Sequence, residues 1–442
     1  MRGAVAAGHP LTAEAGARVL REGGNAADAL LAAAFTAFVT EGPLTGPAGS
    51  GFALVHEPSG ATTVLDFFFG VPATTLGVME ELVVDFGDSG TQTFHVGEGS
   101  VAVPGLLAGL EEVHRRFATR AWSDLVDPAV ALAREGYVRD EPRVVLHGIL
   151  AGILQRSEGG RRIYGDPLRV ATDDFCSTLE SVRDGGAAMV AELLPEYADD
   201  LRGYRVVETR ALEAEVLGRT VRSTPSQGGS VVQRILTLLA EAGEPSLADE
   251  ARAVAEAYGP LGSGPLPGTT HISTIDADGL AAALSSTLGS GSGVFRGGTQ
   301  LNNMLGELDV IGSDEKAPGD RLASMMTPTL VLDAGDPQLV IGSAGSVRLA
   351  GAIAQVTWRF LGGMHVAAAI GAPRLHVEGT TLHLEGGWPD EDVAALPSAW
   401  NVNRWGNLNL YFGGAQAVER TREGGFQAAG DPRRGGVGIV VA

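Results

Sequence analysis

The sequence predicts a mixed α/β protein whose sheets are mainly antiparallel. Three segments show the alternation of apolar and polar residues that is typical of hairpin-like strand pairs, at residues 52–69, 269–288 and 329–341. Helical patterns separate these pairs, which gives the mixed class. Because strands joined by short turns run antiparallel, the pairs argue against a parallel, doubly wound sheet. At 442 residues the chain is long enough for two or three domains, and a single large α/β unit is also allowed.

The composition describes an ordered, acidic, globular protein. Hydrophobic residues make up 44% of the chain, charged residues 19%, and the mean hydropathy is +0.11. The chain can therefore bury a large core. A formal net charge of -21 and an isoelectric point near 4.8 repel phosphate backbones and anionic lipid surfaces. We therefore expect neither a nucleic acid nor a membrane as a partner.

Cysteine and histidine usage limits the possible chemistry. The single cysteine, Cys176, excludes an internal disulfide framework and is interpreted as a small hydrophobic residue. The nine histidines show no metal-ligand spacing, so neither a metal nor another cofactor is expected. Residues 1–8 do not resemble an export signal, and the apolar run at residues 26–40 is too short to span a bilayer. We therefore expect a cytoplasmic protein by default.

Helices and glycine-rich turns dominate the first half of the chain. Thr12 is predicted to cap a helix that runs through Arg21, and Asn25 to cap a second helix over residues 26–40. The glycine-rich turn at residues 42–51 leads into a strand and lacks the Gly-Lys-Ser/Thr ending of a phosphate-binding loop. Further helical patterns cover residues 105–117, most of the stretch to residue 194, and residues 231–242.

The most informative stretch lies where an exposed loop meets a strand. Residues 259–268 are Gly, Pro or Ser at eight of ten positions, and an alternating pattern begins at Thr269. If the bond before Thr269 were cut, that residue would carry a hydroxyl nucleophile and, on the same residue, an α-amine with a pKa of about 8 that can accept its proton. On this stretch alone, a strand that merely begins with two threonines remains the alternative.

The second half of the chain continues with hairpins and a helix. Asp278-Gly279 predicts a tight turn that returns the chain along residues 281–288. A second glycine-rich loop follows at residues 289–298. After the hairpin at residues 329–341, residues 346–360 form a helical pattern that begins behind Gly342-Ser-Ala-Gly345.

Several motifs, in this order, resemble the γ-glutamyltransferase (γ-glutamyltranspeptidase) family of N-terminal nucleophile hydrolases over nearly the whole chain. They are Gly23-Gly24-Asn25-Ala26-Ala27-Asp28-Ala29, Val101-Ala-Val-Pro-Gly105, Pro225-Ser-Gln-Gly-Gly229, Thr269-Thr270-His271-Ile272-Ser273, Leu301-Asn302-Asn303-Met304 and Gly342-Ser343-Ala344-Gly345. One such motif is weak, whereas the ordered set is specific. The resemblance implies a four-layer αββα sandwich with two mainly antiparallel sheets.

The resemblance also implies a mechanism. The family cuts itself before the first threonine of Thr-Thr-His, so residues 1–268 and 269–442 would form a large and a small subunit that stay associated; a higher homo-oligomer is left open. Thr269 would be the nucleophile, and Thr287 the second threonine, whose hydroxyl bonds the nucleophile. The backbone N–H groups of Gly345 and Ser346 would form the oxyanion hole, because the family's second glycine is a serine here but keeps its amide.

The substrate-binding positions depart from the family pattern more than the catalytic ones. Phe68 replaces the arginine that clamps the substrate α-carboxylate, so a charge-assisted donor is exchanged for an apolar ring. Ser324 and Met325 keep part of a Ser-Ser-Met pattern beside that carboxylate. Glu307 aligns with the acid that holds the substrate ammonium, with a plain surface charge as the alternative. Gly289 replaces an asparagine after the second threonine.

Three interpretations remain open at this point. The first is an amidohydrolase or acyltransferase that acts on a small-molecule amide or γ-glutamyl donor. The second is an orthodox glutathione hydrolase whose carboxylate clamp has moved, for instance to Arg296 or Arg321. The third is a non-catalytic paralogue of the fold, which the retained threonines disfavour. His271, two residues along the strand from Thr269, is interpreted as structural.

Overall fold

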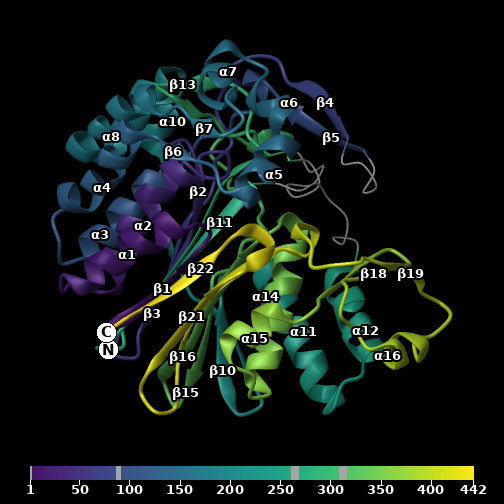
Figure 1. Cartoon of the computed structure of the whole chain (residues 1–442). Helices are drawn as coiled ribbons and strands as arrows, with labels where there is room; N and C mark the ends of the chain where they lie inside the picture. The colour runs from purple at the N-terminus through teal and green to yellow at the C-terminus, as the bar shows by residue number, and fades with distance from the viewer. Residues whose placement is uncertain (1, 86–90, 260–267, 308–315) are drawn as a thin grey trace.

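Two antiparallel sheets pack face to face between two layers of helices (Figure 1). This computed structural model describes residues 2–85, 91–259, 268–307 and 316–442. Figure 1 shows helices α1 and α2 on the outer side of one sheet and helices α11 and α14 on the outer side of the other. The predicted four-layer αββα sandwich with two mainly antiparallel sheets is therefore confirmed.

The first sheet has seven strands, and all of its pairings are antiparallel. In spatial order these are β22 (Val437–Val441), β1 (Gly3–Ala7), β11 (Gly268–Asp276), β12 (Ala281–Gly289), β2 (Ser50–His56), β3 (Thr62–Phe67) and β8 (Val207–Thr209). The second sheet has six strands, also antiparallel: β21 (Phe426–Gly430), β20 (Gly414–Arg420), β16 (Asp336–Ala344), β15 (Thr329–Asp333), β10 (Arg219–Ser223) and β9 (Leu212–Val216).

Helices from the first half of the chain cover the first sheet and its surroundings. They are α1 (Pro10–Arg21), α2 (Ala26–Thr40), α3 (Leu106–Phe117), α4 (Trp122–Glu135), α5 (Glu141–Ile149), α6 (Ala151–Leu154), α7 (Glu158–Tyr164), α8 (Asp173–Gly185), α9 (Val190–Leu193) and α10 (Ala198–Gly203). The second sheet is covered by α11 (Gln227–Ala242), α12 (Leu247–Tyr258), α14 (Leu349–Leu361) and α15 (Val366–Gly371).

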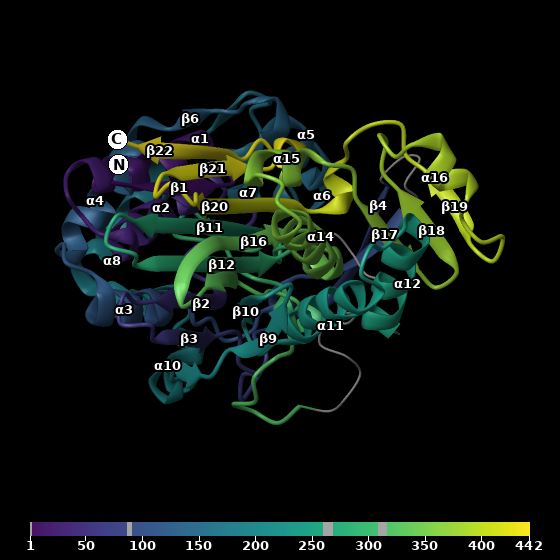
Figure 2. The same ribbon diagram turned by 90° about the horizontal axis from the view of Figure 1, so that it is seen from below.

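A smaller lobe extends beyond the second sheet (Figure 2). It contains β17 (Leu375–Glu378), β18 (Thr381–Leu384), β19 (Asn401–Arg404) and α16 (Asp390–Ala394). Three further strand pairs are short or peripheral: β4 (Glu80–Asp85) with β5 (Thr91–Val96), β6 (Tyr137–Val138) with β7 (Arg169–Val170), and β13 (Phe295–Arg296) with β14 (Thr299–Gln300).

The layer between the two sheets combines small and large apolar residues. Ala4, Ala6, Ala281 and Ala283 of the first sheet pack there against larger side chains of the second, such as Val340. The two outer layers, under the helices, contain the larger apolar clusters. Alternation along β11 places every second side chain in the inter-sheet layer, which is what orients the site described below.

Most predicted elements are confirmed, and their ends are corrected in three places. The three hairpins occur as β2–β3, β11–β12 and β15–β16. Asn25 caps α2 as predicted, through a capping box with Asp28. The first helix starts at Pro10 with His9 as its cap, and Thr12 instead bonds Thr40 and Glu41. The helices predicted over residues 231–242 and 346–360 also begin at other residues. Helix α11 begins earlier, at Gln227, and α14 begins later, at Leu349 after a 3₁₀ turn.

Strand β1 and the C-terminal strands β20, β21 and β22 are not among the predicted elements. Strand β1 is a buried Gly-Ala-Val-Ala-Ala segment without polar alternation, which is why its pattern gives no strand signal. It lies between β22 and β11, so both ends of the chain meet at one side of the first sheet (Figure 1). The predicted loop before Thr269 lies mostly outside the described residues. None of the described helices is both long and apolar enough to cross a membrane.

Candidate active site

Thr269 is the second residue of β11, and its side chain belongs to the inter-sheet face of the first sheet. Ile275, six positions further along and therefore on the same face, lies in the inter-sheet core, whereas Ile272 packs in the core under the helices. Thr270 accordingly points to the opposite side and donates to Glu41 beside α2. The side chains of the two adjacent threonines therefore lie on opposite faces of the first sheet, Thr269 toward the second sheet and Thr270 toward α2.

A β-bulge marks the bond before Thr269. Thr269 lies opposite Thr287 on β12, whereas Gly268 lies opposite Gly289, so the register shifts between residues 268 and 269. The hydroxyl of Thr287 donates a hydrogen bond to the carbonyl oxygen of Gly268. The N–H of Gly289 donates to the same hydroxyl oxygen at 2.8 Å. This relay polarises the carbonyl that a self-cleaving Thr269 would attack.

One pocket brings together most of the predicted site residues. We call it the apolar pocket; its lining residues are Phe68, Thr269, Thr287, Gly289, Met304, Ser324, Met325, Met326, Ser346 and Leu349. Of the eight predicted residues, only Glu307 and Gly345 are absent from this lining. Its lining consists mainly of phenylalanine, methionine and leucine residues, together with Thr269, Thr287, Ser324 and Ser346. Such a pocket favours an apolar substrate group over a charged one.

Phe68 is held firmly in the wall of the apolar pocket. Its ring stacks on Phe52 with the ring centroids 5.4 Å apart and an interplanar angle of 17°, and it meets Phe69 edge to face. A packed aromatic cluster therefore fills the position at which the sequence resemblance places a clamp arginine.

The Pro-Ser-Gln-Gly-Gly motif packs against the backbone of the segment that contains Ser324 and Met325. Ser226 caps α11 by accepting from the N–H of Gly229, and its hydroxyl donates to the carbonyl of Met326 at 2.8 Å. A Cβ at Gly228 would come within 1.8 Å of the Met325 carbonyl oxygen. Glycine is thus required there for α11 to approach the backbone of the pocket wall.

Glu307 is buried immediately behind Gly289, which excludes the alternative of a plain surface charge. Its Oε1 accepts hydrogen bonds from the N–H and the hydroxyl of Ser290, each at 2.9 Å. Gly289 has φ +67°, and a side chain there would collide with Asn303 and approach Glu307. The Asn303 amide therefore occupies the space that a side chain at position 289 would need.

Gly345 and Ser346 follow β16, and Ser346 lines the apolar pocket. Neither N–H donates a backbone hydrogen bond to another described residue. Ser346 has φ +58°, a left-handed conformation that is costly for a residue with a Cβ. Its buried hydroxyl has no hydrogen-bond partner within the described part of the chain, although it lies in the pocket wall.

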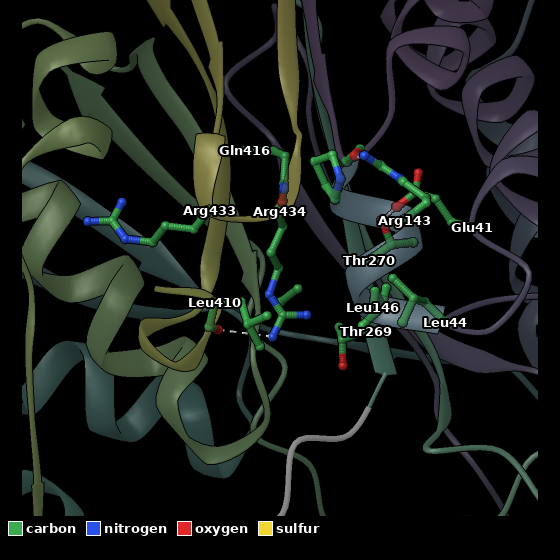
Figure 3. A pocket seen from close by; sticks show the side chains of 13 residues that line it. Glu41, Leu44, Arg143, Leu146, Thr269, Thr270, Leu410, Gln416, Arg433 and Arg434 are labelled. Atoms are coloured by element: carbon green, nitrogen blue, oxygen red, sulfur yellow. Dashed lines mark hydrogen bonds between the residues drawn. The ribbon is translucent and has the colours of Figure 1, made fainter. Parts of the chain in front are cut away.

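A second pocket also has Thr269 in its lining (Figure 3). We call it the arginine pocket; it has a volume of about 30 Å³ and is lined by Gly8, Glu41, Leu44, Pro142, Arg143, Leu146, Thr269, Thr270, Ala344, Leu410, Gln416, Arg433 and Arg434. Thr269 lines both pockets, so a group bound at its hydroxyl would have space on two sides.

The polar groups at the back of the arginine pocket are mutually satisfied. Thr270 donates to Glu41 Oε2 at 2.5 Å, and Thr12 donates to Oε1 at 3.1 Å. Burial raises the pKa of the Glu41 carboxyl, and the nearby Arg143 opposes this shift. Arg143 itself donates to the carbonyl of Gly8 and to Asp140. These contacts fix the start of β11.

His271 has a structural environment, as the sequence predicts. Its two ring nitrogens bond the hydroxyls of Ser285 and Ser273, at 2.8 and 2.9 Å. Burial lowers the pKa of His271 to about 3, so the ring is neutral at physiological pH. Among the described residues, no group of three or more His, Cys, Asp and Glu side chains is arranged to hold a metal ion.

The two arginines suggested for a relocated clamp lie away from Thr269. Arg296 forms a bidentate pair with Glu196, at 2.8 and 3.0 Å. Arg321 donates to the carbonyl of Phe68 at 2.5 Å and stacks over Tyr204. Neither residue lines the apolar pocket or the arginine pocket, so that suggestion was wrong.

Glu41, Arg143 and Arg434 are site residues that sequence reasoning missed. They come from the end of α2, from α5 and from the 3₁₀ turn Pro432–Arg434. Only pairing between segments that are distant in sequence brings them beside Thr269. The Asp-Pro-Arg-Arg sequence at residues 431–434 is the one local signal, because two adjacent arginines near a buried strand are unusual.

Comparison with known proteins gives one consistent result. The sequence profile of the family described as Gamma-glutamyltranspeptidase matches residues 12–145 and 249–441. The glutathione hydrolase proenzyme of Escherichia coli (strain K12) is 26% identical over 98% of this chain and 90% of its own. The Acylase ACY 1 proenzyme of Pseudomonas sp. (strain SE83) is also 26% identical, over 89% of this chain and 86% of its own.

A solved structure has the same fold. The crystal structure of cephalosporin acylase from Bacillus halodurans superposes with a TM-score of 0.79 over 99% of this chain and 95% of that chain, at 20% identity. This likeness concerns the fold, whereas the sequence profile covers well over half of the chain. The chain therefore belongs to the gamma-glutamyltranspeptidase family.

Proposed function

We propose that this protein is a self-processing threonine amidohydrolase or acyltransferase. The observation that carries the proposal is the hydrogen bond from the Thr287 hydroxyl to the carbonyl of Gly268, at a β-bulge directly before Thr269. This side-chain hydrogen bond is not one of the backbone hydrogen bonds that hold the two strands together. It stabilises negative charge on the oxygen when the carbon is attacked.

The self-cleavage step is an N-to-O acyl shift. The Thr269 hydroxyl oxygen attacks the Gly268 carbonyl carbon, the bond from that carbon to the Thr269 nitrogen breaks, and the hydroxyl proton passes to the nitrogen. Water then hydrolyses the ester and leaves a Gly268 carboxylate and a free Thr269 amine. With Gly268 detached, the Thr287 hydroxyl becomes available to bond the hydroxyl of Thr269.

The two products, residues 1–268 and 269–442, would stay together because they share both sheets. In the first sheet, β1 pairs with β11 and β22, and β2 pairs with β12. In the second sheet, β10 pairs with β15. Separation would break each of these ladders and open all three apolar cores. This supports an intertwined heterodimer as the mature form.

The mature reaction uses the same groups. Thr269 attacks a substrate amide carbonyl, its own α-amine takes the hydroxyl proton, and the amide nitrogen leaves with that proton. Water or an amine then attacks the acyl-threonine. The N–H groups of Gly345 and Ser346 would stabilise the oxyanion, and the Ser346 hydroxyl would donate to the bound substrate. The strain at Ser346 supports this role, because strained residues concentrate at functional sites.

Ser346→Gly is expected to stabilise the protein and to reduce its activity. Glycine relieves the positive φ, which should raise the free energy of unfolding by about 1 kcal/mol. Loss of the hydroxyl should lower kcat/KM by about 10-fold. Chemical denaturation and amide hydrolysis measured on the same preparation test both parts. Unchanged activity in Ser346→Gly would show that only the backbone amide matters.

The favoured donor is an amide whose acyl group is apolar. Phe68 and the methionines of the apolar pocket offer no partner for a γ-glutamyl α-carboxylate, which would lose about 2–5 kcal/mol if buried without one. Glu307 lies behind Gly289, and we propose that it reads a substrate ammonium where one is present. Orthodox glutathione hydrolysis is the second candidate and is favoured only by the family relationship.

Phe68→Arg is expected to increase kcat/KM for a γ-glutamyl anilide by about 10-fold, mainly through KM, because it restores a charge-assisted donor. The substitution also removes the stacking on Phe52, so some stability is lost. Steady-state kinetics of both proteins measure the effect, with Phe68→Met as the apolar control. A micromolar KM for glutathione in the wild type would contradict the preference for apolar donors.

The proposed function predicts a covalent intermediate that mass spectrometry can detect. Rapid acid quenching during turnover of a p-nitroanilide with an apolar acyl group should add the mass of that acyl group to the 269–442 fragment. Peptide mapping should locate the addition at Thr269. Turnover with an adduct at another residue, or with none under conditions where acylation is faster than hydrolysis, would contradict an acyl-threonine mechanism.

A further inference from the structure

Arg434 carries the cation that faces Thr269 across the arginine pocket. Figure 3 shows its side chain directed toward Thr269, whereas the side chain of Arg433 points away from it. Arg433 forms ion pairs with Glu385 and Asp431, at 2.5 and 3.1 Å. The two adjacent arginines therefore have different roles, and Arg433 holds the turn together.

Arg434 has no carboxylate partner among the described residues. Its Nη2 donates to the carbonyl of Leu410 at 3.4 Å, and its buried Nε has no hydrogen-bond partner. Asp431, the acidic side chain closest in sequence, is bound by Arg374 at 2.6 Å and by Arg433. A guanidinium without a carboxylate in such a place is costly unless an anion completes it.

The other charged groups of the arginine pocket do not compete for such an anion. Glu41 is held by Thr270 and Thr12, and Arg143 by Gly8 and Asp140. Burial and the neighbouring Arg348 lower the pKa of Arg434 to about 10, so its guanidinium remains charged at neutral pH. Among the described residues that line this pocket, Arg434 is thus the cation whose N–H groups remain available to bind an anion.

The position of Arg434 relative to the apolar pocket decides which part of a substrate it would bind. An amide attacked by Thr269 has two arms, one on the carbonyl carbon and one on the nitrogen. The apolar pocket contains Ser346, one of the proposed oxyanion residues, and suits an apolar acyl arm. The amine arm then lies on the side of the arginine pocket, which Thr269 also lines.

We propose that Arg434 binds a carboxylate on the amine half of the substrate, so that the substrate class is an N-acyl amino acid with an apolar acyl group. This rests on the proposed function above and specifies its leaving group. In the acylation step, the bond from Thr269 Oγ to the acyl carbon forms and the bond from that carbon to nitrogen breaks. The amino acid departs with the proton, and Arg434 stays charged throughout.

Two matched substrates, N-hexanoylglycine and N-hexanoylglycinamide, test the assignment, since they differ only in the carboxylate. The wild type should prefer the carboxylate substrate by about 10-fold to 100-fold in kcat/KM, mainly through KM, as a charge-assisted pair implies. Arg434→Met should reduce this preference to about 1, mainly by raising the KM of the carboxylate substrate. Arg422→Met, at an exposed arginine of the same C-terminal region, should keep the preference.

A binding measurement separates this inference from the proposed function. Isothermal titration of the ketone analogues 4-oxononanoate and 4-oxononanamide, in which CH2 replaces the scissile nitrogen, into the purified wild type needs no turnover. The carboxylate should bind more tightly than the neutral amide, and Arg434→Met should abolish the difference. If this preference exists but the wild type neither self-cleaves nor hydrolyses amides, the proposed function fails and the Arg434 site stands. Equal binding of both compounds, or a preference that Arg434→Met leaves intact, would overturn the Arg434 site alone.

Discussion

Thr269→Ala is expected to remain a single chain of 442 residues and to lose amide hydrolysis by at least about 10⁴-fold. The substitution removes the oxygen that would attack the Gly268 carbonyl and, after cleavage, the substrate. Its Cβ stays, and the strand register around it depends on backbone bonds, so the fold should persist. A denaturing gel and a discontinuous assay for released amine measure the two effects.

Thr269→Ser is the matched control, because it keeps the hydroxyl and removes only a methyl group. It should cleave itself, although more slowly, and retain measurable hydrolysis. If Thr269→Ala were still processed before residue 269, the attacking group would have to be a different one, and the proposed mechanism would be wrong.

Thr287→Val is expected to slow both self-cleavage and turnover by about 10²-fold to 10³-fold. Valine matches the shape of threonine but cannot donate to the Gly268 carbonyl, so the developing oxyanion loses a preorganised donor. The N–H of Gly289 also loses its acceptor. A time course of fragment formation, started from freshly synthesised protein, measures the first effect, and steady-state kinetics of processed protein measure the second.

Two further variants isolate the role of that hydroxyl. Thr287→Ser should recover most of the rate, because it restores the donor. Thr45→Val removes a buried hydroxyl that bonds Ser286, the neighbour of Thr287 on β12. Because Thr45 lines neither pocket, this variant should affect stability more than rate. Cleavage of Thr287→Val at the wild-type rate would show that the hydrogen bond to Gly268 has no part in processing.

The pairing of Thr269 with Thr287 could be anticipated because it is a local property of one hairpin. The Asp278-Gly279 turn fixes the register, and residues equally distant from it along the two strands become partners. Phe68 and Ser324, like Thr287, were assigned through the family motif, but no local pattern places them at the site. They reach the apolar pocket through packing of Phe68 on Phe52 and of residues 324–326 on α11.

Arg434 and Glu41 illustrate what the sequence could not supply. They lie 165 and 228 residues from Thr269, and only the order of strands in the two sheets brings them together. The suggestion of Arg296 or Arg321 as a clamp relied on residue type without position, and both turned out to be bonded elsewhere. A sequence shows which residues carry a charge, but only the tertiary structure shows which of these charges are paired.

The intact mass of the purified wild-type protein tests the central claim most directly. Self-cleavage at the Gly268–Thr269 bond predicts two fragments, residues 1–268 and residues 269–442, that co-purify under native conditions and separate on denaturation. Sequencing of the smaller fragment should begin Thr-Thr-His-Ile-Ser. A single 442-residue chain that nonetheless hydrolyses amides would contradict the account.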